Sequence, residues 1–105
     1  LKDNIQTISG SLNKVMNLRG VEYVWNKGGR KGQKDLGVVA QEVEKVLPEI
    51  VREKRLPLMD SSDKTYKTVD YERITAVLIE GMKEQQEQID DLRREVEELK
   101  DGSSK

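Results

Sequence analysis

A heptad pattern in the carboxy-terminal third of the chain constrains the fold most strongly. From Tyr71 onward, apolar residues recur in steps that alternate between four and three. With Ile89 at heptad position a, the predicted seam consists of Leu78, Met82, Gln85, Ile89, Leu92, Val96 and Leu99. Such a stripe is typical of a helix that packs against other helices in a coiled coil. We therefore expect residues 71–100 to form one long helix, followed by a frayed tail over residues 101–105.

The seam leaves the number of associated helices open. In isolated peptides, mixed β-branched residues at position a with Leu at position d favour a coiled coil of two helices. Glu95 at position g and Lys100 at the next position e have the separation that pairs neighbours in a parallel coiled coil. Gln85 at position d is a polar interruption of the kind that specifies register. The heptads alone do not decide between a dimer and a trimer.

The first 70 residues predict a small α+β head. Its first helix is expected over residues 11–18, with Ser9 or Ser11 as the cap. Gly20 is expected after the end of this helix. A second helix is predicted over residues 41–47, because its apolar residues return to helical spacing.

Two hairpins complete the predicted head. Residues 21–25 are rich in β-branched and aromatic residues and are expected to pair with the apolar run 36–40. Tyr23 and Trp25 in the first strand are expected to anchor the core. A second, looser hairpin is predicted from the short extended segments 49–55 and 66–69. The polar residues 60–64 between these segments predict its turn.

Composition excludes several classes of function. The 105 residues are 34% hydrophobic and 37% charged, so the chain can bury only a modest core and subunit association is expected. The net charge of -1 argues against a nucleic-acid-binding domain. Without Cys or His there is no disulfide, no Ser-His-Asp triad and no imidazole zinc ligand, and we expect no cofactor. No apolar run approaches the roughly 18 residues of a membrane span.

Lys2 is the candidate for chemistry. In a chain without His, a neutral lysine amine is the most credible general base for a serine nucleophile. On spacing alone, an ordinary surface lysine is the simpler interpretation. The basic segment 27–34 lacks the Walker spacing, which favours a solvated hairpin tip over a phosphate site. Glu42, Glu44 and Glu49 are expected at solvated positions.

An ordered series of motifs runs through the whole chain. It comprises Leu1-Lys2-x-Asn4-Ile5, Leu18-Arg19-Gly20-Val21-x-Tyr23-x-Trp25, Gly37-Val38-Val39-Ala40-Gln41-Glu42-Val43, Leu47-Pro48-Glu49, Val69-Asp70-Tyr71, Leu78-Ile79-Glu80 and Lys83-Glu84-Gln85-Gln86. This series resembles the C-terminal intramolecular chaperone domain of phage tail spikes and fibres. The domain is known as the endosialidase-type chaperone and is classed as peptidase S74.

The resemblance implies a parallel homotrimer that holds the chains of an upstream β-rich stalk in register. The stalk belongs to a tail fibre, tail spike or neck appendage, and the trimer of the family outweighs the dimer preference of the seam. Release follows by autoproteolysis between Ser and Asp of a Ser-Asp-x-x-Leu-Lys type segment. By position, Lys2 is the general base, and the nucleophilic Ser lies five residues before it, upstream of Leu1. The chain is then the released product, or a chain trimmed to resemble it, and should be inactive alone.

The expected partners are two further copies and the stalk of the same polypeptide, with neither nucleic acid nor membrane. The expected location is the host cytoplasm during virion assembly, and then the tail structure of the virion. One alternative is a permanent trimerisation or attachment module without proteolysis. Another, within the same family, is a membrane-tethered transcription factor that trimerises and cleaves itself. The residues upstream of Leu1 would distinguish these functions.

Overall fold

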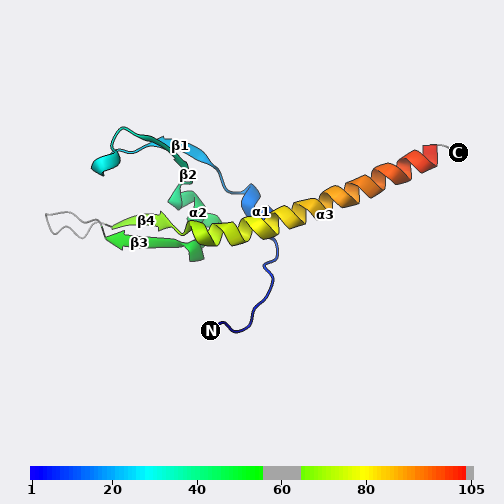
Figure 1. Ribbon diagram of the computed structural model, residues 1–105, viewed down its shortest axis with the longest axis horizontal. Coiled ribbons are helices and arrows are strands. Elements are labelled where there is room, and N and C mark those ends of the chain that lie inside the picture. Colours follow the sequence, from blue (N-terminus) through cyan, green and yellow to red (C-terminus); the bar gives the residue numbers. More distant parts are fainter. Residues whose placement is uncertain (56–64, 104–105) are drawn as a thin grey trace.

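A small head with one long projecting helix makes up the molecule (Figure 1). The computed structural model describes residues 1–55 and 65–103. Its principal extents are 78 × 39 × 21 Å and its radius of gyration is 20.7 Å. A compact domain of this length would have a radius of gyration of about 13 Å. The long helix therefore extends far beyond the part of the chain that covers it.

The α+β class predicted from the sequence is confirmed, because two small hairpin sheets precede a long carboxy-terminal helix. In chain order the elements of the described residues are α1 (Ser11–Met16), β1 (Val21–Val24), the 3-10 turn η1 (Gly28–Arg30), β2 (Lys34–Gly37), α2 (Ala40–Val46), the 3-10 turn η2 (Pro48–Ile50), β3 (Val51–Arg55), β4 (Thr65–Val69) and α3 (Tyr71–Ser103).

Both predicted hairpins are present. Strands β1 and β2 are antiparallel, with Val21 opposite Gly37, and β3 and β4 are antiparallel, with Val51 opposite Val69. The second strand of the first hairpin is shifted from the prediction, because it ends at Gly37 and Ala40 already begins α2. The apolar run after Gly37 therefore links the hairpin to a helix instead of extending the strand. The predicted turn at residues 60–64 lies outside the described residues.

Helix α1 begins where expected but is capped differently. Gly10, with φ of 70°, occupies the N-cap position, and no side chain of the flanking residues caps the helix. The prediction of Ser9 or Ser11 as the cap is wrong. Instead, the backbone N–H groups of Ser11 and Leu12 donate to the Glu84 carboxylate of α3, at 3.2 and 2.5 Å. These are orphan donors of a first helical turn, and a distant acidic side chain satisfies them.

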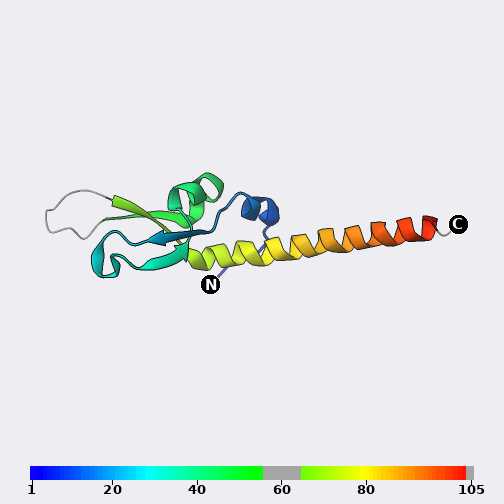
Figure 2. The same cartoon turned by 90° about the horizontal axis from the view of Figure 1, so that it is seen from above.

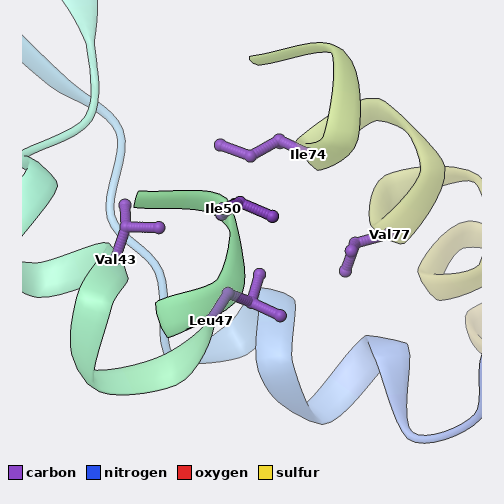
Figure 3. Packing of buried hydrophobic residues seen from close by; sticks show 5 residues of the cluster. All are labelled: Val43, Leu47, Ile50, Ile74 and Val77. Atoms are coloured by element: carbon purple, nitrogen blue, oxygen red, sulfur yellow. The ribbon is translucent and has the colours of Figure 1, made fainter. Parts of the chain in front are cut away.

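The core is small and lies between α2, η2 and the first turns of α3. Figure 3 shows its five buried side chains, which are Val43, Leu47, Ile50, Ile74 and Val77. Leu47 is the C-cap of α2, and Pro48 after it begins η2, which turns Ile50 back toward α3. Each fully buried aliphatic side chain contributes about 1.5–3 kcal/mol of transfer free energy. A core of this size supports the expectation that the chain gains burial by association.

Tyr23 and Trp25 stand outside this core, which corrects the expectation that they anchor it. Both are half-buried, and their rings meet edge to face with centroids 5.4 Å apart. The Trp25 Nε1–H donates to Asp35 at 3.2 Å, and the Arg30 guanidinium lies 5.4 Å from the centroid of the Trp25 ring. The aromatic pair thus stabilises the first hairpin locally. A cation over the ring face adds a favourable electrostatic contact.

Helix α1 packs closely against α3, as Figures 1 and 2 both show. Gly81 permits this approach, because a Cβ at that position would lie 3.2 Å from Val15 Cγ2 and 3.6 Å from the Leu12 Cα. The same turn of α3 that carries Gly81 leads to Glu84. Close contact and capping therefore coincide at one joint between the two helices.

Candidate functional site

Helix α3 presents two faces that lie next to each other. One face is covered by the head: Ile74 and Val77 belong to the core, and Gly81 is buried beneath α1. Spacings of three and four residues keep these positions on one side of the helix. The second face begins one residue later, at Thr75, and carries the heptad seam predicted from the sequence.

The seam face is exposed in the single chain. The exposed fraction of its apolar side chains ranges from 38% for Ile89 to 74% for Leu99, and Gln85 is exposed as well. The residues concerned are Leu78, Met82, Ile89, Leu92, Val96 and Leu99. One helix face that exposes this many large apolar side chains is typical of an association surface. The structure thus brings the predicted seam residues together on one face, and their role in a trimer stays a prediction.

The length of α3 extends this exposed surface. Helix α3 contains 33 residues, which is about 50 Å at roughly 1.5 Å per residue. It continues through Asp101 to Ser103, beyond the predicted end at residue 100. In Figure 1 its carboxy-terminal half extends away from the head. Seam residues at that end therefore lack cover from the head.

Lys2 lies in the exposed lead-in that precedes α1. Residues 1–10 are all exposed, and Leu1 and Ile5 are among the large apolar residues that face solvent. Within residues 1–55 and 65–103, the Lys2 amine makes no hydrogen bond or ion pair with a side chain. Lys2 thus has no side-chain partner in the part of the chain that the structure describes, and its catalytic role stays a prediction.

Two of the carboxylates expected at solvated positions form ion pairs that tie α2 to its neighbours. The Arg19 guanidinium donates to both oxygens of Glu42, at 3.1 and 2.6 Å, and these bonds lower the pKa of the Glu42 carboxyl. The Lys67 amine lies 2.7 Å from Glu44, and their hydrogen bond raises the pKa of Lys67. Exposed pairs of this kind contribute little to stability. They link α2 to Arg19, which precedes β1, and to Lys67 of β4.

Glu84 is the residue of the joint that sequence reasoning missed. Backbone hydrogen bonds lower the pKa of its carboxyl, the bond from Leu12 most strongly and the one from Ser11 less so. The sequence did contain a signal for this joint, because an isolated Gly within a helical pattern often marks a close packing contact. Gly81 is such a residue, and Glu84 lies one turn after it on the same side of α3. Only the position of α1 reveals what the carboxylate binds.

Neither a metal site nor a membrane span emerges from the described residues. In residues 1–55 and 65–103, the Asp and Glu side chains form no cluster of three or more that could hold a metal ion. Over the same part of the chain, no helix has both the length and the apolar content needed to cross a bilayer.

Comparison with known proteins identifies the family. The family described as chaperone of endosialidase, peptidase S74, matches residues 1–52. The chain belongs to the chaperone-of-endosialidase family. The resemblance drawn from the sequence motifs is thereby confirmed. Membership supports a role in chaperoned assembly, and the peptidase class implies self-cleavage in the context of a longer precursor.

Curated relatives are long tail fibre proteins. The long tail fiber protein Gp37 of Enterobacteria phage K3 is 38% identical over 88 residues, which cover 79% of this chain and 6% of that protein. Gp37 of Enterobacteria phage T2 has the same identity and coverage. Gp37 of Salmonella phage S16 is 26% identical over 106 positions, covering 96% of this chain and 14% of that protein. The chain thus spans only a small part of the length of these relatives.

Proposed function

We propose that this chain is the chaperone module of a phage fibre protein. Three copies associate in parallel through the exposed face of α3 and hold the chains of an upstream β-rich stalk in register. In a longer precursor, the module then releases itself by cutting the backbone upstream of Leu1. It acts in the host cytoplasm during virion assembly, and its product belongs to a tail structure of the virion.

The exposed seam is the observation that carries this proposal. Six large apolar side chains line one face of α3, whereas the buried core within residues 1–55 and 65–103 contains five. Each of the six gains about 1.5–3 kcal/mol of transfer free energy if association buries it fully. Association through this face would thus bury more large apolar side chains than the described core does. The family and its tail-fibre relatives support assignment of that association to fibre assembly.

Association first and stalk folding second is the physically favourable order. A stalk of intertwined β-chains depends on contacts between residues far apart, so it folds slowly and exposes strands that aggregate. Joining the three carboxy-terminal modules converts encounter of the stalk chains into an intramolecular event. The α3 seam supplies the joint, and its polar residue Gln85 helps to set the register.

Lys2 is the proposed general base of the cleavage. The hydroxyl of a serine upstream of Leu1 attacks the carbonyl carbon of the scissile Ser-Asp peptide bond, and the C–N bond of that peptide breaks as an ester forms. The Lys2 amine accepts the hydroxyl proton and passes it to the leaving amine, after which water hydrolyses the ester. A lysine must be neutral for this role, and burial favours the neutral form. Since Lys2 is exposed in the single chain, we propose that the precursor or a neighbouring protomer supplies the burial or the nearby positive charge that favours a neutral amine.

Two measurements test this function. Light scattering of the purified chain should give three times the chain mass at micromolar concentration, and a monomer would refute the proposed association. A precursor with its upstream stalk should yield two bands on a denaturing gel. Lys2→Ala should leave that precursor trimeric but uncut, whereas the matched change Lys31→Ala, at another exposed lysine, should cleave normally. Full cleavage of Lys2→Ala would remove Lys2 from catalysis, and a parent that never cleaves would favour a permanent trimerisation module.

A further inference from the structure

The position of the head on α3 determines what lies beside it in a parallel coiled coil. In the heptad that places Ile89 at a, the head covers Ile74 and Gly81 at position g and Val77 at position c. In parallel association, position g of one helix lies next to the following position e of its neighbour. Each head must therefore lie on the side of the seam that the neighbouring helix approaches with its e residues.

The chemistry of these e and g positions changes along α3. The pair near the carboxy-terminal end is Glu95 with Lys100, opposite charges that suit a solvated flank. The equivalent pair at the head end is Ile74 with Ile79, both apolar. Apolar residues at the flank of a coiled coil indicate that something further covers them, because e and g positions are usually charged.

Ile79 is the unexplained member of that apolar pair. Its side chain is 55% exposed in the single chain, and it lies outside the core to which Ile74 belongs. At position e, Ile79 lies next to the stripe of a and d residues and on the opposite side of α3 from Val77. Its own head therefore leaves Ile79 uncovered, at the level where the head of a neighbour would be present.

We propose that Ile79 of each protomer packs against the head of the neighbouring protomer, beside that protomer's Ile74. The inference rests on the parallel association of the proposed function and adds a second component to the interface. The coiled coil alone would join three helices, whereas this contact joins each helix to a folded head. Association then depends on folded heads, because the seam and the heads form one interface.

Thiol accessibility tests the contact directly, because the chain contains no Cys. Three single variants would be compared in the assembled state: Ile79→Cys, Arg93→Cys at the same heptad position two heptads later, and Ala76→Cys at an exposed position b. Alkylation by a maleimide should be several-fold slower at position 79 than at position 93, and fastest at position 76. Equal rates at positions 79 and 93 would show that the coiled coil alone covers position e and would overturn the inference.

A second pair of variants keeps the test independent of cysteine chemistry. Ile79→Glu should raise the concentration at which the assembly dissociates, because it places a charge in the proposed contact. Ala76→Glu should leave that concentration unchanged. Both residues are exposed in the single chain, so neither substitution should disturb the folded head. Sedimentation equilibrium measures both. Unchanged dissociation of Ile79→Glu in a parent that does assemble refutes the head contact alone. A parent that remains monomeric refutes the proposed association itself, so the two failures are distinguishable.

Discussion

The Glu84 carboxylate accepts the backbone N–H of Leu12 at 2.5 Å, although 72 positions separate the two residues in the chain. The same carboxylate accepts the N–H of Ser11 at 3.2 Å. An acidic side chain of the long helix thus caps the first turn of a short one. Since α1 follows the lead-in that carries Lys2, this joint connects the proposed cleavage segment to the proposed trimer seam.

Removal of the Glu84 carboxylate should loosen α1. In Glu84→Ala the amide protons of Ser11 and Leu12 lose their acceptor, so hydrogen exchange at both should become markedly faster. Glu84→Gln retains one carbonyl oxygen and should show an intermediate rate. Glu87→Ala, one turn later on α3, is the matched control and should leave both amides protected. Unchanged exchange in Glu84→Ala would show that α1 is held by packing alone.

The same contact predicts a dependence on pH. Hydrogen bonds lower the pKa of the Glu84 carboxyl in the folded chain below its value of about 4.3 in an unfolded chain. Its contribution to stability is therefore complete above the unfolded value and is lost as the pH falls through the folded value. The Tm difference between the parent and Glu84→Gln should be largest near pH 6 and shrink toward pH 3. A difference that stays constant over this range would contradict the prediction, with Glu87→Gln as the control.

A larger residue at Gly37 should destabilise the fold while Tyr71 keeps its hydroxyl. A Cβ at Gly37 would lie 2.8 Å from the Tyr71 Oη, an atom that also accepts the Val38 N–H at 3.4 Å. Overpacking of this kind costs about 1–3 kcal/mol. Gly37→Ala should therefore lower the free energy of unfolding, and Tyr71→Phe should relieve part of the loss. Denaturant titration of both single variants and the double variant gives the coupling, and strict additivity would refute the contact.

Leu47 is the core residue whose truncation should cost most. It is 2% exposed and lies where α2 ends, packed with Ile50 and Val77. Leu47→Ala should lower the free energy of unfolding by about 2–5 kcal/mol, because the cavity cannot collapse fully. Leu36→Ala, at a residue 70% exposed in the first hairpin, is the matched control and should change little. Urea titration measures both, and equal losses would argue against the core described above.

A charge in the seam should separate the protomers. Ile89→Asp would place a carboxylate between the associating helices, where burial of an unpaired charge is strongly unfavourable. We expect this variant to be monomeric at micromolar concentration by light scattering, with a head that still melts cooperatively. Ala76→Asp adds the same charge on the outer surface of α3 and should remain assembled. Association of Ile89→Asp equal to that of the parent would show that the heads alone suffice.

Local patterns determined the elements of this protein. The heptad spacing after Tyr71, the β-branched run at residues 21–25 and the stop at Pro48 each act through neighbours a few residues away. For that reason the sequence by itself determined the start of α3 and both ends of α2 to within a residue. The presence of both hairpins was determined as well, although the second strand of the first one lies at residues 34–37 instead of 36–40. It also determined the seam face, because helical periodicity alone places those residues together. The ordered motifs were sufficient to predict the family.

The tertiary structure decided the contacts between residues far apart in the chain. The cap of α1 comes from Glu84 instead of a nearby serine, because the carboxylate reaches the orphan N–H groups only after α1 packs on Gly81. Trp25 lies outside the core, where its indole N–H donates to Asp35 across the hairpin and its ring meets that of Tyr23. Such outcomes depend on which surfaces meet, and a periodic pattern carries no information about that. The side of α3 that the head covers was decided in the same way.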